Sequence, residues 1–141
     1  MKSGDAMTKL SIIMFSGTAD KLMPVGVLAS AAAGLGYDVE IFATFWGLLA
    51  LKKDSPPPEV SKDYGPIGEM FKKVMEEKNM PSFLDMLREA KEIGNVKIYA
   101  CAQTFDMMGL KKEDLVDIVD DVIGAMEYLE KSKESDITLF I

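Results

Sequence analysis

Residues 9–46 decide the fold, and they read KLSIIMFSGTADKLMPVGVLASAAAGLGYDVEIFATFW. The apolar run at 9–16 has the length of one strand and ends in a Gly-Thr turn, which is typical of a strand buried on both faces. Asp20 then caps a predicted helix whose apolar positions recur at helical spacing and which ends near Gly34. Residues 38–46 form a second apolar and aromatic run, which predicts another interior strand. Strand, helix and strand in this order indicate a right-handed βαβ unit.

The rest of the chain continues this alternation after one interruption. Three consecutive prolines and a later Gly-Pro pair predict a mobile loop at 52–66, because proline neither continues a helix nor pairs inside a sheet. The elements predicted after this loop are a helix with apolar residues from Ile67 to Met75, a helix capped by Ser82 and closed by Gly94, a strand at 96–101, a mostly helical stretch at 112–133 in which 116–119 allows a brief strand, and a last strand at 137–141.

A chain of 141 residues has the usual size of one domain, so these elements predict a single domain over residues 1–141. Alternating strands and helices place the helices on the two faces of a sheet. We therefore expect an α/β protein, a three-layer α/β/α sandwich with a mostly parallel sheet of about five strands.

Charge and composition exclude several classes of function. The formal net charge is −7 and Arg88 is the only arginine, so neither a nucleic acid nor an anionic membrane surface is an expected partner. The absence of histidine excludes Ser-His-Asp and Cys-His catalysis and His-ligated zinc. No metal or other cofactor is expected. No apolar stretch approaches the roughly 20 residues needed to span a membrane, and the first residues do not resemble a targeting segment, so we expect a soluble cytoplasmic protein.

Cys101 is the only cysteine, which rules out an internal disulfide, a CxxC redox pair and a four-thiolate cluster. It lies where the strand at 96–101 ends, and ligands of open parallel sheets bind beyond the carboxyl ends of the strands. A lone cysteine after an apolar strand is more often a small buried hydrophobe than a nucleophile. A thiolate facing the amides at the start of the next helix would nevertheless have a lowered pKa. Both interpretations stay open at this point.

Other residues give weaker signals. Residues 16–18 (SGT) lack any phosphate-loop motif and are most simply a turn into a helix. Residues 44–47 (TFWG) end the second predicted strand and could line a pocket, although aromatic residues there are usually core. Residues 107–109 (MMG) would suit a polarisable pocket. The acidic run at 113–121 is most simply a solvated helix face, with metal binding as the weaker alternative.

Three segments together resemble the DsrE/DsrF-like sulfur-relay family, specifically its second DsrE subtype: SGTADKLMPVGVLASAAAGLGYDVEIFATFWGLLALKK at 16–53, IYACAQTFDMMGLKKEDL at 98–115 and SDITLFI at 135–141. The resemblance covers nearly the whole chain from Thr8 onward. It implies a three-layer α/β/α domain that assembles as a homo-oligomer, with a persulfide carried on the cysteine at position 101. It therefore assigns Cys101 the role of the sulfur-carrying residue.

The chemistry of sulfur transfer needs one activated thiolate and neither a metal nor a second internal thiol. Cys101 would take sulfur from thiosulfate or polysulfide as a persulfide or thiosulfonate and pass it to a thiol partner, such as a TusA-like or rhodanese-type protein; this would be a sulfurtransferase activity. Three hydroxyls would donate hydrogen bonds to the anionic sulfur species, and four large side chains would wall the site. The predicted substrate-binding residues are Thr18, Thr44, Phe45, Trp46, Thr104, Phe105 and Met108.

Two other functions remain open. The family is sometimes labelled peroxiredoxin-like, which suggests a one-cysteine thiol peroxidase, but Ile98 stands where the threonine of a TxxC peroxidatic motif would be. The other alternative is a non-catalytic binding or assembly subunit in which Cys101 is inert and buried. Homo-oligomerisation is compatible with each, because the apolar segment 137–141 is an edge strand with surface to cover.

Overall fold

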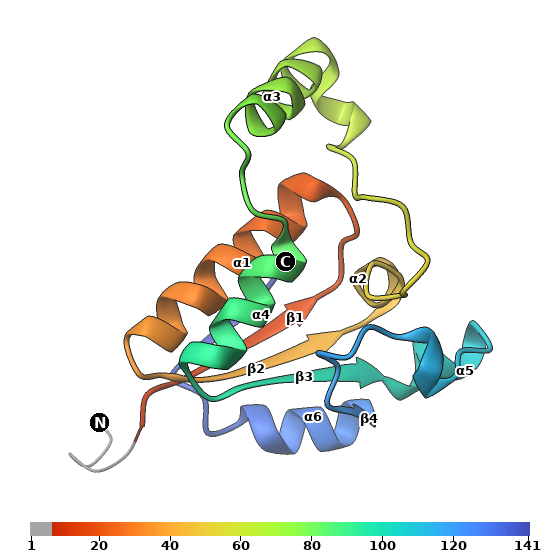
Figure 1. Cartoon of the computed structure of the whole chain (residues 1–141). Helices are drawn as coiled ribbons and strands as arrows, with labels where there is room; N and C mark the ends of the chain where they lie inside the picture. The colour runs from red at the N-terminus through yellow and green to blue at the C-terminus, as the bar shows by residue number, and fades with distance from the viewer. Residues whose placement is uncertain (1–6) are drawn as a thin grey trace.

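The computed structural model of the chain describes residues 7–141 and has one parallel sheet at its centre (Figure 1). The strand order is β4-β3-β2-β1-β5, and every neighbouring pair is parallel. The strands are β1 (Lys9–Met14), β2 (Asp38–Ala43), β3 (Val96–Cys101), β4 (Asp121–Ile123) and β5 (Ile137–Phe140). The predicted fold class is confirmed, and the sheet is entirely parallel.

Helices cover both faces of this sheet. The α-helices are α1 (Ala19–Gly34), α2 (Phe45–Leu49), α3 (Gly65–Glu77), α4 (Phe83–Ile93), α5 (Ala102–Met107) and α6 (Ala125–Ser132), and two short 3-10 turns are η1 (Lys62–Tyr64) and η2 (Lys112–Asp114). Helices α1 and α4 lie side by side on one face, and α6 lies on the other (Figure 1). Within residues 7–141 no helix has the length and apolar character needed to cross a membrane.

The larger core lies between the sheet and the pair α1 and α4. Alternate strand residues such as Ile12, Ile41 and Ile98 are completely buried there. Helices α1 and α4 approach closely because small residues line α1: a Cβ added at Gly26 would lie 3.0 Å from the Cβ of Met86. The small side chains seen in the sequence of this helix therefore set the distance between the two helices.

A second, smaller cluster lies on the α6 face of the sheet. It contains Phe42, Tyr99, Cys101, Ile123 and Tyr128. The ring of Tyr128 on α6 stacks on that of Phe42 on β2, with centroids 4.6 Å apart and an interplanar angle of 12°. Because side chains alternate along a strand, β3 directs Ile98 into the larger core and Cys101 into this smaller one.

Two stretches differ most from the prediction, and the first and last strands end one or two residues earlier than predicted. The second strand ends at Ala43 and not at residue 46, because Phe45 has a positive φ of 48° and begins α2. The stretch 112–133 is not mostly helical, and its short strand lies at 121–123 rather than 116–119. Residues just before β4 turn toward the loop after α2 instead, where Val116 N–H donates to the Leu51 carbonyl (2.8 Å) and Lys52 bridges to Leu115.

The α1 cap and the predicted loop also differ in detail. Thr18 is the N-cap of α1, whereas Asp20 lies in the first turn, where its carboxylate accepts a hydrogen bond from the Ser61 amide at 2.8 Å. This contact ties the segment 52–66 to the sheet domain, and η1 forms within that segment. The prediction that the first residues do not form a targeting segment rests partly on residues 1–6. These residues lie outside the part of the chain that the structure describes.

Helix α3 stands away from the sheet domain (Figure 1). Its apolar stripe has the predicted helical spacing, yet Ile67, Met70 and Phe71 are 71%, 61% and 53% exposed. Among the helices and strands of residues 7–141, its main contact is with η1, and it faces α1 and α4 across a pocket. The periodicity therefore predicted the helix correctly, but the stripe does not face the core.

Candidate functional site

Cys101 is the last residue of β3 and the N-cap residue of α5. Its side chain is 5% exposed and belongs to the smaller cluster under α6. The neighbouring strand β2 runs parallel to β3, with Ala43 opposite Ala100, so the residues that follow the two strands meet at one edge of the sheet. This geometry brings Thr44, just after β2, next to the start of α5.

Two buried threonines flank the thiol. The hydroxyls of Thr44 and Thr104 are 3.2 Å apart, and the side chains are 8% and 1% exposed. The Phe45 amide donates a hydrogen bond to the Thr104 hydroxyl oxygen at 3.1 Å. Because Thr104 already accepts a bond from this amide, its own hydroxyl hydrogen is free to point to a neighbouring acceptor.

These groups lower the pKa of the Cys101 thiol below its ordinary value of 9.0. Burial by itself raises the pKa, but hydrogen bonds from the Thr44 hydroxyl, the amide and hydroxyl of Thr104 and the Gln103 amide stabilise the thiolate and outweigh burial. The sulfur does not form a regular side-chain cap of α5, so its stabilisation depends on these donors together. The site is therefore a buried thiol in a polar cradle.

The turn from β2 into α2 has unusual backbone geometry. Phe45 adopts a left-handed conformation, which is costly for a bulky residue, and this places its amide against Thr104. Gly47 allows α2 to approach β1 closely, because a Cβ there would lie 2.2 Å from the Met14 carbonyl oxygen. The sequence TFWG thus holds the wall of the cysteine site in a single arrangement.

An aromatic row runs from this turn along the carboxyl edge of the sheet. The Phe45 ring lies 5.5 Å from that of Phe15, and Phe15 lies 5.6 Å from Phe140. Phe45 and Phe140 are 42% and 67% exposed. This row of three aromatic rings therefore forms an apolar surface that extends from β5 to Phe45, next to Thr104.

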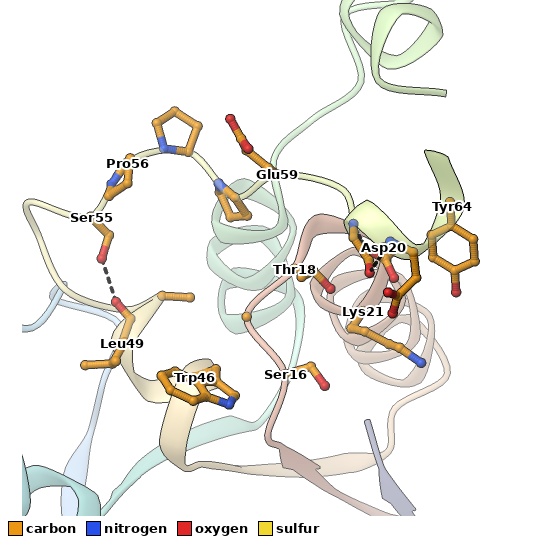
Figure 2. A pocket seen from close by; sticks show the side chains of 16 residues that line it. Ser16, Thr18, Asp20, Lys21, Trp46, Leu49, Ser55, Pro56, Glu59 and Tyr64 are labelled. Atoms are coloured by element: carbon orange, nitrogen blue, oxygen red, sulfur yellow. Dashed lines mark hydrogen bonds between the residues drawn. The ribbon is translucent and has the colours of Figure 1, made fainter. Parts of the chain in front are cut away.

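The other predicted substrate-binding residues do not gather around Cys101. Thr18 and Trp46 line a pocket of about 700 Å³ between α2, the start of α1 and the proline segment at 56–58 (Figure 2). Cys101 is not among the residues that line this pocket. Phe105 packs against the larger core. Met108 lines a separate depression beside Lys53. Thr44 and Thr104 are thus the predicted residues that the structure places at the thiol, and Phe45 is linked to them through its amide bond to Thr104.

Two features of these sites were missed in the sequence. The Gln103 amide faces the thiol, a role that its position two residues after Cys101 at a helix start could have indicated. Asp20, which lines the pocket of Figure 2, accepts a hydrogen bond from the Ser61 amide, and no sequence signal links residues so far apart.

The acidic run at 113–121 serves mainly in ion pairs. Asp117 binds Arg88 at 2.9 Å, and Asp120 binds Lys91 at 2.5 Å and accepts the Ile98 amide at 2.8 Å. In the part of the chain that the structure describes, no three acidic or cysteine side chains are grouped so that they could hold a metal ion. These carboxylates anchor the β4 side of the sheet.

The fold and the site define a class: α/β domains with one buried cysteine, whose pKa is lowered, at the carboxyl end of a parallel strand. The sequence profile of the DsrE/DsrF/DrsH-like family matches residues 6–71 and 61–140, and the chain belongs to this family. The resemblance seen in the sequence is confirmed.

Two curated relatives match almost the full chain. One is the uncharacterized protein YrkE of Bacillus subtilis, 33% identical, with 94% of this chain and 96% of the relative covered. The other is the sulfur carrier protein DsrE2 of Allochromatium vinosum, 34% identical, with 94% and 98% covered.

Solved structures share the fold at low sequence identity. The protein of unknown function BT1422 from Bacteroides thetaiotaomicron has a TM-score of 0.61 and 14% identity, with 97% of this chain and 100% of that chain covered. MTH1491 from Methanobacterium thermoautotrophicum, also of unknown function, has a TM-score of 0.51 and 16% identity, with 95% and 99% covered.

Proposed function

We propose that the protein acts in sulfur relay by carrying sulfane sulfur as a persulfide on Cys101. Two findings support this proposal: the chain belongs to the DsrE/DsrF/DrsH-like family, and one relative of similar length is named a sulfur carrier. The observation that carries the assignment to Cys101 is the cradle of hydroxyl and amide donors that lowers the pKa of the thiol. A cysteine that is only packed in apolar surroundings has its pKa raised instead.

The proposed chemistry is two nucleophilic displacements at sulfur. The Cys101 thiolate attacks the outer sulfur of thiosulfate, a new S–S bond forms, the old S–S bond breaks, and sulfite leaves with the electron pair. Polysulfide would react in the same way and release a shorter chain. The thiolate of a partner protein then attacks the outer sulfur of the persulfide, takes it, and restores the Cys101 thiolate. No electron is gained or lost overall, so neither a metal nor a redox cofactor is required.

The cradle suits the product as well as the attacking group. A persulfide is an anion one sulfur longer than the thiolate, and the hydroxyls of Thr44 and Thr104 would donate to either. Of the other residues predicted to bind the substrate, Phe45 adjoins the cradle. The remaining ones would contact the substrate only if the second sulfur or the sulfur donor extended beyond the cradle; they are Thr18, Trp46, Phe105 and Met108.

Access is the step that the proposal must explain, because Cys101 is 5% exposed. The segment that follows it is short: α5 has six residues, and Gly109, two residues after its end, has a φ of 63°. Met107 and Met108 at its end are 62% and 47% exposed. We propose that this segment moves outward to admit the sulfur donor. The same burial favours the alternative of an inert cysteine in a binding or assembly subunit.

Intact-mass analysis of the native protein after exposure to thiosulfate or polysulfide tests the proposal. We expect a gain of one sulfur atom that dithiothreitol removes and that is absent in Cys101→Ser. Tetrathionate should give the corresponding thiosulfonate adduct on the same residue. An unmodified mass with every donor, together with labelling by iodoacetamide only after unfolding, would establish the inert alternative.

Matched variants separate the cradle from general effects. Thr104→Val should slow adduct formation, whereas Thr138→Val, at the exposed edge of the sheet, should not. Transfer from the loaded protein to a TusA-like or rhodanese-type thiol protein, followed by the mass of both partners, tests the second displacement. Peroxide consumption faster than that of a free thiol would favour the peroxidase alternative.

A further inference from the structure

Strand β5 forms an unprotected edge of the sheet. It pairs with β1 on one side, and no strand within residues 7–141 pairs with its other side. Its sequence, ITLF, followed by Ile141, contains no charge, proline or glycine. Ile137 and Phe140 are 42% and 67% exposed, and Thr138 is also exposed. Soluble proteins normally blunt such an edge with charge, proline or a covering segment.

The backbone groups that face outward can be identified from the pairing with β1. Ile141 N–H donates to the Ile13 carbonyl and Phe15 N–H donates to the Ile141 carbonyl, each at 2.9 Å. Residue 141 therefore faces β1, and because the direction alternates along a strand, so do residues 137 and 139. The N–H and C=O groups of Thr138 and Phe140 point away from the sheet.

The opposite edge of the sheet is protected in the usual way. Strand β4 has three residues, begins with the exposed Asp121, and lies beside Lys112, whose Nζ is 3.9 Å from the Asp121 carboxylate. Charge and shortness both discourage pairing there. The contrast indicates that the apolar β5 edge is kept open for a partner.

We propose that β5 pairs antiparallel with β5 of a second copy of this chain, about a two-fold axis at Leu139. In this register Thr138 lies opposite Phe140 of the second copy. Each of these two residues donates its N–H to the other's carbonyl, and the symmetry axis repeats the pair. The two five-stranded sheets then form one continuous sheet.

Side chains extend the contact beyond the backbone. Strand pairing over so few residues is small against the roughly 800 Å² per partner of a stable interface, so apolar side chains must add to it. Phe140 shares the face of the sheet with Phe15, 5.6 Å away. In the proposed register the two Phe140 rings are diagonal neighbours, within reach of each other. The aromatic row thus continues from one copy into the next.

A second copy is the occupant that fits this edge best. A single two-fold axis pairs the unpaired N–H and C=O groups of both β5 edges with each other, so the interface is self-complementary. No side chain of residues 137–141 is charged, so two chains with a net charge of −7 each can pair there without opposing charged side chains. An extended peptide from another protein would leave its own outer edge unpaired.

Sedimentation of the purified full chain over a range of micromolar concentrations tests the pairing. We expect a reversible monomer–dimer equilibrium. Thr138→Pro should raise the dimer dissociation constant at least about 30-fold, because proline removes an outward N–H and its ring meets the second copy. The pairing with β1 does not use this N–H. Thr138→Val keeps the amide and should change the constant less than about threefold.

A second variant, which introduces a charge, distinguishes loss of the dimer from loss of folding. Thr138→Lys should also dissociate the dimer, whereas Leu129→Lys, on an exposed residue of α6, should not. Hydrogen exchange gives the register: the amides of Thr138 and Phe140 should gain protection as concentration rises, while that of Ile141 is protected throughout. A monomer at every concentration overturns the proposal, as does a dimer that withstands both Thr138→Pro and Thr138→Lys or leaves the Thr138 and Phe140 amides unprotected.

Discussion

Thr44→Val should slow the reaction of native Cys101 with iodoacetamide at neutral pH. The Thr44 hydroxyl is the first of the donors that lower the pKa of the thiol. Valine keeps the β-branched shape and suits the extended backbone at this position, which has a φ of −133°. The substitution removes the Thr44 donor together with its 3.2 Å contact to the Thr104 hydroxyl, and it leaves the Phe45 amide bonded to Thr104.

The magnitude follows from the energy of that hydrogen bond. A bond to a charged group contributes about 1.5–3 kcal/mol, so its loss lowers the ratio of thiolate to thiol at a given pH roughly 10- to 100-fold. A thiolate of higher pKa is intrinsically more nucleophilic, and this offsets nearly half of the effect on a logarithmic scale. The expected fall in the alkylation rate is roughly three- to tenfold, with the pH midpoint of the reaction moved upward.

The assay is intact-mass measurement of alkylation over a pH series, with Thr138→Val as the matched control. The wild type and the control should share one pH profile, and Thr44→Val should be displaced to higher pH. The reasoning is refuted if the Thr44→Val profile coincides with that of the wild type. Reaction of all three proteins only after unfolding would refute it as well.

Three further outcomes are expected. The pKa of Cys101 in the folded state is lowered from 9.0, so ionisation of the thiol stabilises the fold. This stabilisation is complete above pH 9 and is lost as the pH falls through the folded-state pKa. In urea titrations, the difference in unfolding free energy between the wild type and Cys101→Ser should therefore grow from neutral to alkaline pH. Gly47→Ala should destabilise the fold by at least about 2 kcal/mol through its contact with Met14, whereas Gly34→Ala, with open space around it, should be neutral or slightly stabilising. Ser82→Ala removes the α4 cap and should lower the unfolding free energy by about 1 kcal/mol without changing alkylation of Cys101.

The sequence predicted a helix or strand correctly wherever the residues of that segment alone indicate it. The βαβ unit, the caps at Ser82 and the strand ending at Cys101 were all predicted, because apolar period and capping chemistry are properties of neighbouring residues. The pattern misled at 112–133, where contacts with Leu51 and Lys52 compete with helix formation. Long-range partners of this kind leave no periodic trace in the segment itself.

The candidate site shows the same division. The sequence identified Cys101 and the threonines at 44 and 104 as candidates, but it grouped them with Thr18, Trp46, Phe105 and Met108. The structure separates these, because Thr18 and Trp46 face a pocket on the proline-segment side and Phe105 turns into the larger core. Residues that follow strands share an edge of the sheet, but each side chain's direction depends on the turn that precedes it.

The sequence alone determined the layer order, the parallel sheet and the family, because strand length, helical period and motif residues are written along the chain. Only the tertiary structure decided that the thiol is buried, which donors face it, that the stripe of α3 is exposed and that the β5 edge is unpaired. Burial and the pKa of a buried group depend on atoms brought from distant segments, in this case from the ends of β2 and β3. The distances between those ends are set by packing between helices and sheet, which no single segment specifies.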